Sequence, residues 1–396
     1  MFRIVLLSTY YQNKPSANGI CAKNLVGELK KRGYEVNVIC YNNNSINEKN
    51  VYYVREPLIE NNNKFKKVLR KLFMFLRQVI LIKSPIINKK LSNDYYNQLK
   101  KINNNKKIDV IISMCFPIES VDAAYRFKKN HPFVKFLIYE LDSFGDGVFT
   151  SLLQKFNARK ADNWLKKVYK LANKVFVMKG HEIYWKKRFG KEYINKLCVT
   201  DLPILVARTS HSNVSFKNTY YFLYAGLIQS SYRNPEYLLK LFENLTKFCD
   251  FEFSFYSKGD CEKLIAREII KFPQIKQYGY VSENILNEAI LETDVLISIG
   301  NRVSSSVPSK LINYFSYGKP IIHFSSRKDD ICIMYLKKYP LALIIDECES
   351  IEENTIKLYK FLLKLHGKSI NLSEILIDYY MNTPSYNVNL IEKMMQ

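Results

Sequence analysis

Two cations, Arg233 and Lys310, have the clearest potential for chemistry in this 396-residue chain. Arg233 lies in a loop that follows the apolar run 220–225 and Gly226 and precedes a predicted helix. A guanidinium at this place can hold a diphosphate and neutralise the charge that builds up as a nucleotide leaves. The alternative is an arginine that is solvated at the surface.

Lys310 belongs to a hydroxyl-rich segment at the predicted start of a second helix. Pro308 fits the first helical turn, and Gly318 ends the helix before the strand 320–324. Hydroxyls, free N–H groups and an ammonium thus converge on one helix N-terminus, which favours a phosphate or sugar site over an ordinary capped helix. The residues expected at this start are Ser305, Ser306, Val307, Ser309 and Lys310, with Ser306 or Val307 as the cap.

Candidate contacts in the N-terminal half are less specific. Gly19 stands at the predicted start of a helix, where a glycine lets backbone N–H groups approach an anion closely, although an ordinary loop glycine has the same signature. Glu140 and Asp142 end a predicted strand, so their carboxylates could orient a hydroxyl group of a substrate. Asp142 could equally cap a helix.

Metal chemistry is not indicated by the sequence. The 8 cysteines lie far apart, with no CxxC pair and no histidine at metal-ligand spacing, and the 5 histidines share no motif. We expect reduced thiols, a core or surface role for His323, no metal and no other cofactor.

The elements that must position these residues form a pattern that occurs in each half of the chain. The predicted strands of the first half are 2–8, 35–41, 109–114, 134–141 and 174–179, with helices at 19–32, 118–129 and 151–172. The pattern restarts after Pro203, with strands at 220–225, 251–256, 294–299, 320–324 and 342–345 and helices at 235–246, 261–271, 282–292, 308–317 and 350–365. Strands that are apolar throughout and alternate with helices predict parallel sheets.

The predicted fold class is therefore α/β, with two doubly wound, Rossmann-like domains that face a central cleft. We place the N-terminal domain at 1–205 and the C-terminal domain at 206–380, with the linker near 200–216, where Pro203 and a polar run interrupt the periodicity. A last helix at 381–396 is expected to pack back towards the N-terminal domain.

The charge of the chain favours anionic partners. Lys and Arg number 60 against 37 Asp and Glu, which leaves a net charge of +23. No nucleic-acid-binding motif accompanies this charge, so we expect no nucleic acid partner. The stretch 64–83 combines helical apolar spacing with basic residues and predicts a helix on an anionic membrane surface, with a helix packed on the first domain as the alternative. No apolar run is long enough for a membrane span or a signal peptide, so we expect a cytoplasmic protein.

The order of the motifs resembles the retaining family 4 glycosyltransferases, whose two-domain fold is called GT-B. The resemblance covers essentially the whole chain and is most specific in the second half. The segments that carry it are Arg-Gly-Tyr-Glu-Val at 32–36, Tyr-Ala-Gly at 224–226, Tyr-Gly-Tyr-Val at 278–281, Asp-Val-Leu-Ile-Ser at 294–298 and Pro-Ser-Lys-Leu-Ile-Asn-Tyr-Phe-Ser-Tyr-Gly-Lys-Pro-Ile-Ile at 308–322.

This resemblance implies that Arg233 takes the place of the family's phosphate-binding lysine, that Gly19 contacts the donor diphosphate, and that 279–281 hold the nucleobase. The helix start at 305–310 would hold the sugar and the phosphates. Two glutamates that the family commonly places on this helix are Ser305 and Asn313 here, and an arginine after the strand-end glycine is Leu227. Ser305 and Asn313 can still hydrogen-bond a hydroxyl, but neither carries charge.

The resemblance and the residues together predict a metal-independent, retaining transferase. It would move a sugar from a nucleotide-diphospho-sugar to a lipid-linked or other glycan acceptor, in the synthesis of a capsule or exopolysaccharide at the inner face of the membrane. Arg233 and Lys310 are the predicted catalytic residues, and Glu140 and Asp142 the predicted positioning residues. The predicted donor-binding residues are Gly19, Gly226, Arg233, Tyr280, Val281, Ser305, Ser306, Ser309, Lys310 and Asn313. The alternatives are a non-catalytic GT-B subunit that supports a partner transferase and a GT-B nucleotide-sugar epimerase.

Overall fold

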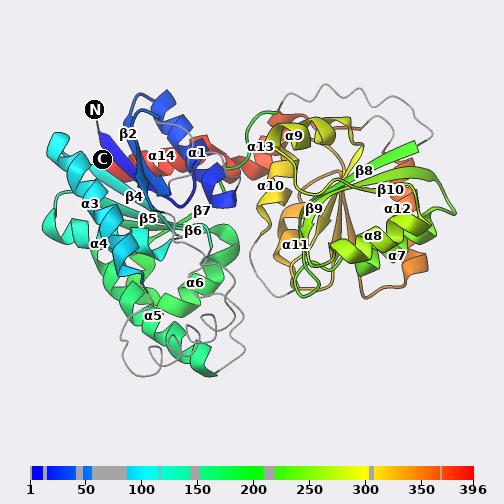
Figure 1. Ribbon diagram of the computed structural model, residues 1–396, viewed down its shortest axis with the longest axis horizontal. Coiled ribbons are helices and arrows are strands. Elements are labelled where there is room, and N and C mark those ends of the chain that lie inside the picture. The colour runs from blue at the N-terminus through cyan, green and yellow to red at the C-terminus, as the bar shows by residue number, and fades with distance from the viewer. Residues whose placement is uncertain are drawn as a thin grey trace. The chain divides into compact units, whose positions relative to one another are not determined.

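The computed structural model describes the chain in nine stretches. They are residues 2–11, 16–41, 48–55, 87–115, 117–142, 152–208, 219–302, 307–365 and 368–396. The predicted membrane helix at 64–83 and the predicted site residues Ser305 and Ser306 lie outside these stretches. The chain divides into a first unit, Met1–Pro203 with Met381–Gln396, and a second unit, Ile204–Tyr380 (Figure 1).

The first unit is built on a parallel sheet of 7 strands in the order β3-β2-β1-β4-β5-β6-β7. Its strands are β1 (Arg3–Leu7), β2 (Glu35–Tyr41), β3 (Val51–Val54), β4 (Val110–Cys115), β5 (Lys135–Glu140), β6 (Lys174–Met178) and β7 (Leu197–Thr200). Its helices are α1 (Ala17–Lys31), α3 (Lys89–Asn105), α4 (Ile118–Asn130), α5 (Leu152–Leu171), α6 (Glu182–Phe189) and α14 (Pro384–Met395), with short 3-10 turns η1 (Lys179–His181) and η2 (Lys191–Lys196).

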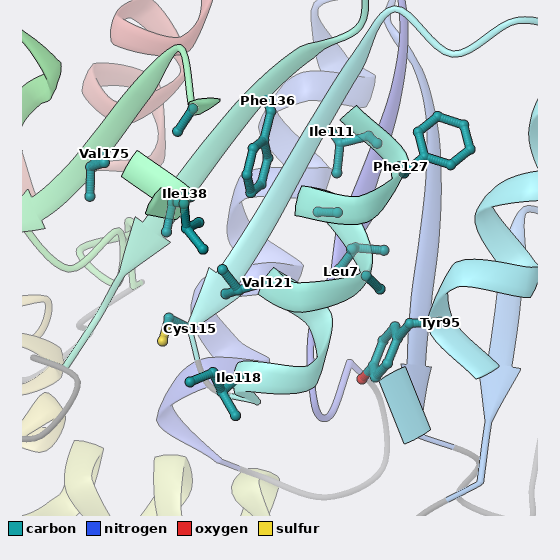
Figure 2. Packing of buried hydrophobic residues seen from close by; sticks show 14 of the residues in the cluster. Leu7, Tyr95, Ile111, Cys115, Ile118, Val121, Phe127, Phe136, Ile138 and Val175 are labelled. Atoms are coloured by element: carbon teal, nitrogen blue, oxygen red, sulfur yellow. The ribbon is translucent and has the colours of Figure 1, made fainter. Parts of the chain in front are cut away.

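The core of this unit lies between the sheet and the helices that connect its strands. Because crossovers are right-handed, helices that connect strands towards one edge of a sheet lie on one face, and those that connect strands towards the other edge lie on the opposite face. The helices α3 and α4 contact each other and share one face. Figure 2 shows Tyr95 of α3 and Phe127 of α4 on the side of the sheet where β4 and β5 present Ile111 and Phe136. Each such side chain contributes about 1.5–3 kcal/mol by leaving water.

The second unit repeats this architecture with a parallel sheet of 6 strands in the order β10-β9-β8-β11-β12-β13. Its strands are β8 (Thr219–Ile228), β9 (Asp250–Gly259), β10 (Ile275–Gln277), β11 (Val295–Ile299), β12 (Ile321–Ser325) and β13 (Ala342–Asp346). Its helices are α7 (Glu236–Leu245), α8 (Glu262–Lys271), α9 (Glu283–Glu292), α10 (Ser309–Phe315), α11 (Ile331–Leu336), α12 (Ile351–Leu363) and α13 (Leu372–Tyr379), and the 3-10 turn η3 (Tyr380–Asn382) leads to α14. Its core includes a cluster of aromatic rings on β8, β9 and α7, with Phe222, Phe242 and Phe253 fully buried.

The C-terminal helix α14 is fixed to the first unit by polar contacts. Asn387 is fully buried, and its side-chain oxygen accepts hydrogen bonds from the hydroxyls of Tyr139 and Thr200. Arg32, just after α1, pairs with Glu392 at 2.6 Å. A buried amide whose hydrogen bonds are all made fixes the orientation of the helix that carries it, here α14.

Two predicted boundaries in the second unit are wrong. Gly226 does not end its strand, because β8 continues in register with β9 as far as Ile228. The N-cap of α10 is Pro308 rather than Ser306 or Val307, so the helix begins at Ser309. Within the described stretches, no helix has both the length and the apolarity needed to cross a bilayer.

Candidate functional site

The strand order of the second unit defines where a ligand is expected. The order reverses between β8 and β11, and ligands of open parallel sheets bind outside the carboxyl ends of the strands at such a switch point. Arg233 follows β8 and Asn301 follows β11. The Arg233 Nε donates a hydrogen bond to the Asn301 Oδ1 at 2.7 Å, so one contact joins the two loops at this point.

A tight turn holds Arg233 in place. Gln229 and Arg233 exchange backbone hydrogen bonds of 3.2 and 2.7 Å, and the Arg302 N–H donates to the Tyr232 carbonyl at 2.9 Å. The hydroxyl of Tyr224 lies against the Arg233 guanidinium and donates to the Leu227 carbonyl at 3.0 Å. Burial raises the pKa of Tyr224 to about 12, and Arg233 opposes that rise. The phenol therefore stays protonated beside the cation.

A buried polar network supports the loop that carries Asn301. His323 lies on β12 and is fully buried; its Nδ1 is 3.0 Å from the Ser298 Oγ, and its Nε2 is 3.0 Å from the Asp330 Oδ2. A Cβ atom on Gly300 would lie 2.0 Å from that same carboxylate oxygen, so the pair packs directly against the backbone before Asn301. Burial alone would raise the pKa of Asp330, but hydrogen bonds with His323 and with the Cys332 N–H hold it below its usual range.

His323, Asp330 and Cys332 also form the one group of potential metal ligands found in the described stretches, with ligand atoms within 4.8 Å of one another. Both ring nitrogens of His323 already have partners in Ser298 and Asp330. A metal ion would have to replace those hydrogen bonds. We therefore assign the network the structural role of holding the loop at Gly300.

Lys310 belongs to different surroundings from Arg233, although both lie in the second unit. Its ammonium interacts with Glu283 and Arg208, and burial lowers its pKa, with Arg208 lowering it further and Glu283 opposing. Tyr314, one helical turn on, accepts a hydrogen bond from the Ala225 N–H at 2.9 Å and lies near Arg233. The hydrogen bond between Tyr314 and Ala225 joins α10 to β8. Lys310 lies on α10 and Arg233 lies near Tyr314 of the same helix, but no contact between the two cations is seen among the described residues.

The other predicted donor residues of the second unit are spread more widely. Asn313 lies near the hydroxyl of Tyr317, which donates a hydrogen bond to the Asn287 Oδ1 at 2.6 Å. Gly279 has φ +70°, a left-handed conformation that glycine adopts freely, and Tyr280 after it is 66% exposed. A surface hollow of about 620 Å³ at the ends of β9 and β10 is lined by Tyr278, Gly279, Tyr280, Lys258 and Glu262 among others. Val281 follows, partly buried, and Ser309 begins α10.

Gly19 lies inside the first turn of α1, and its N–H donates to the Ser16 Oγ at 3.0 Å. Ser16 is therefore the N-cap of α1, and the Gly19 N–H that we expected to face an anion is bonded to the Ser16 hydroxyl. A Cβ atom at Gly19 would lie 3.1 Å from the Tyr10 carbonyl oxygen, which explains why a small residue fits there. A role for Gly19 at the donor stays a prediction.

The structure places the Glu140 carboxylate in the interior of the first unit, and its positioning role stays a prediction. The side chain is 2% exposed and accepts a hydrogen bond from the Tyr169 hydroxyl. Burial raises its pKa to about 7, with the Tyr169 hydrogen bond and Arg188 acting against that rise. Asp142 is exposed at the end of the same strand, and its positioning role stays a prediction.

The structure adds residues that the sequence did not single out. Asn301 was missed because a loop asparagine carries no distinctive spacing. Arg208 was seen only as part of a polar linker. The pairing of His323 with Asp330 depends on the turn after β12, which no periodicity shows.

No protein-family model matches this chain, and no curated protein matches it in sequence. Solved structures of low identity match it over nearly its whole length. The chain is similar to a lipopolysaccharide outer core galactosyltransferase, WaaB, at 14% identity and a TM-score of 0.56, covering 99% of this chain and 100% of that one. It is similar to the catalytic domain of starch synthase IV from Arabidopsis thaliana bound to ADP and acarbose, at 8% identity and a TM-score of 0.62, covering 100% and 98%. It is also similar to UDP-GlcNAc 2-epimerase from Methanocaldococcus jannaschii, at 11% identity and a TM-score of 0.58, covering 99% and 100%. These similarities confirm the predicted fold class: two parallel-sheet α/β domains of the GT-B type.

Proposed function

We propose that this protein is a metal-independent glycosyltransferase that takes a sugar from a nucleotide-diphospho-sugar, with retention of configuration at the sugar. The observation that carries the proposal is the hydrogen bond from Arg233 to Asn301 across the switch point of the second sheet. A cation fixed at this point is placed where open α/β sheets bind phosphate-containing ligands. The proteins to which this chain is similar include a galactosyltransferase and a starch synthase bound to ADP.

The chemistry asked of the site is charge stabilisation. Transfer breaks the bond between the sugar and the diphosphate, and the leaving nucleoside diphosphate gains negative charge. Arg233, preset by Asn301 and the Tyr224 hydroxyl, stabilises that charge without reorganising. Lys310 supplies a second positive charge, and Asn313 on the same helix offers an amide to a hydroxyl of the donor.

The acceptor in this proposal is a lipid-linked or other glycan in the synthesis of a surface polysaccharide. The name of WaaB, which acts on lipopolysaccharide, supports a polysaccharide setting. The basic amphipathic sequence at 64–83 supports work at the inner face of a membrane.

The donor test is a thermal-shift screen of nucleotide sugars, followed by measurement of donor hydrolysis and transfer by the purified chain. At least one nucleotide-diphospho-sugar should raise the melting temperature, because a ligand that binds the native state stabilises it. It should also be slowly hydrolysed. Binding without hydrolysis or transfer would favour the non-catalytic subunit, conversion to an epimeric nucleotide sugar would favour the epimerase, and no binding at all would refute a nucleotide-sugar site.

The membrane test is co-sedimentation with vesicles that contain anionic lipid. Binding should weaken as salt rises, because screened lysines lose their attraction to the surface. Replacing Lys66, Lys67, Arg70 and Lys71 with Gln should release the protein. If this variant pelleted as well as the parent, the stretch 64–83 would not be the membrane contact.

A further inference from the structure

Two cations of the second unit share a single carboxylate. Arg208 Nη2 lies 3.6 Å from the Glu283 Oε1 at the start of α9, and the Lys310 ammonium interacts with the same Glu283. Arg208 and Lys310 also repel each other. Two positive charges against one negative charge leave an excess of positive charge at this place, which an anion would neutralise.

The guanidinium of Arg208 has hydrogen-bond donors to spare. Its distance to Glu283 is too long for a hydrogen bond, and its Nε is buried without a hydrogen-bond partner among the described residues. A buried donor of this kind is normally satisfied in a native protein or by its ligand. The ring of Tyr317, whose centroid is 5.8 Å from the Arg208 Cζ, limits how the planar group can turn. Arg208 is thus limited in how it can turn, and its Nε has no hydrogen-bond partner in the part of the chain that the structure describes.

Lys310 likewise lacks hydrogen-bond partners among the described residues. In the described stretches its ammonium forms no hydrogen bond and no ion pair within the usual contact distance, while burial disfavours its charged form. A simple ion pair between Arg208 and Glu283 would leave this lysine uncompensated. A shared anionic ligand would satisfy both cations together.

We propose that Arg208 and Lys310 together bind a phosphate or diphosphate group, and that Glu283 compensates part of their charge when the ligand is absent. The inference rests on the proposed function and adds Arg208 and Glu283 to its site. A guanidinium fork beside an ammonium is suited to phosphoryl oxygens, which accept several charge-assisted hydrogen bonds. The group could belong to the donor diphosphate or to a phosphorylated acceptor.

The test measures the affinity of the full chain for inorganic pyrophosphate and for UDP, ADP, GDP and CDP by calorimetry. Arg208→Gln should weaken binding about tenfold to a hundredfold, the usual effect of losing a charge-assisted hydrogen bond. Arg208→Lys should lie between this variant and the parent, because it keeps the charge and loses the fork. Glu283→Gln should tighten binding about twofold to fivefold, since a competing, partly exposed carboxylate is removed.

The ion pair between Lys276 and Glu252, 2.6 Å long and exposed, supplies matched controls. Lys276→Gln and Glu252→Gln change the net charge of the chain by the same amounts as Arg208→Gln and Glu283→Gln. They should leave every affinity within twofold of the parent. Equal effects from both sets would mean that net charge alone drives binding, and the inference would be overturned.

Competition identifies the source of the phosphate. If a saturating nucleoside diphosphate excludes pyrophosphate, the pair binds the donor diphosphate; if pyrophosphate still binds and Arg208→Gln removes it, the pair binds a separate phosphate group. Unchanged affinities in Arg208→Gln and Glu283→Gln, with nucleoside diphosphate binding intact, would reduce the pair to a structural ion pair and leave the proposed function standing. If the chain bound pyrophosphate through Arg208 but bound no nucleotide sugar, the proposed function would be refuted and phosphate binding by Arg208 would stand.

Discussion

The two units share one architecture but carry different chemistry at the same topological place. In the first sheet the order reverses between β1 and β4, and the described residues that directly follow β1, Ser8–Tyr11, carry hydroxyl groups and no charge. Ser8 is fully buried and donates to the Tyr10 carbonyl at 3.2 Å. In the second sheet the corresponding loops carry Arg233, Asn301 and Arg302.

After β1, the Ser8 hydroxyl bonds to the backbone of its own loop, whereas the loops after β8 and β11 carry two arginine side chains. Hydroxyls that bond their own backbone stabilise a loop and offer little to an anion. An oriented guanidinium offers several donors and a charge. Under the proposed function, this comparison favours the second unit as the place of the phosphate-containing ligand.

The largest effect is expected from Arg233→Ala. Loss of one charge-assisted contact that strengthens in the transition state should slow turnover by about tenfold to several hundredfold. Folding should survive, because the side chain is only partly buried. Steady-state kinetics and donor calorimetry are the measurements, with Ser8→Ala as the matched change at the other switch point. Ser8→Ala should leave donor affinity unchanged. If both variants lost the same donor affinity, the two switch points would not differ in function.

A glycine in each unit gives the next contrast. The Cβ atom of Gly300→Ala would meet the Asp330 carboxylate at 2.0 Å inside the buried His323 network, where nothing can move freely. Such overpacking costs about 1–3 kcal/mol, and the shifted loop should also weaken donor binding through Asn301. Gly19→Ala meets its nearest atoms at 3.1 Å and gains helix propensity, so its net cost should stay below about 1 kcal/mol.

Urea unfolding at one pH measures both variants, and donor calorimetry adds the functional readout. A Gly300→Ala protein with parental stability and parental donor affinity would show that the His323 network does not support the loop at Asn301.

The sequence predicted the fold well because its evidence is local. Buried parallel strands are apolar along their whole length, so runs such as 35–41 and 174–179 were found close to their observed bounds. Short edge strands were missed, among them β3 and β10, because a few residues with partial burial have no clear period. The charged residues were visible, but their partners were not. Asn301 reaches Arg233, and Arg208 reaches Glu283, only through turns that join distant parts of the sequence.

The smallest effect is expected from Glu140→Gln, in the pH dependence of stability. This variant tests whether the Glu140 carboxylate is structural or contacts a substrate. Burial raises its pKa from 4.5 to about 7. An acid whose pKa is higher in the folded state favours folding below its unfolded pKa, and that contribution is lost as pH rises through the folded value. The parent should therefore lose stability between pH 4.5 and about 7, and Glu140→Gln, which keeps an oxygen for the Tyr169 hydroxyl, should lose less over that range. At pH 8 the variant should exceed the parent by about 1–2 kcal/mol, less than the full shift implies, because a buried amide has its own cost. Urea unfolding from pH 4.5 to 8 measures the difference, and donor affinity should not change. If both proteins showed the same pH dependence and the variant lost transfer activity, Glu140 would belong to the reaction after all.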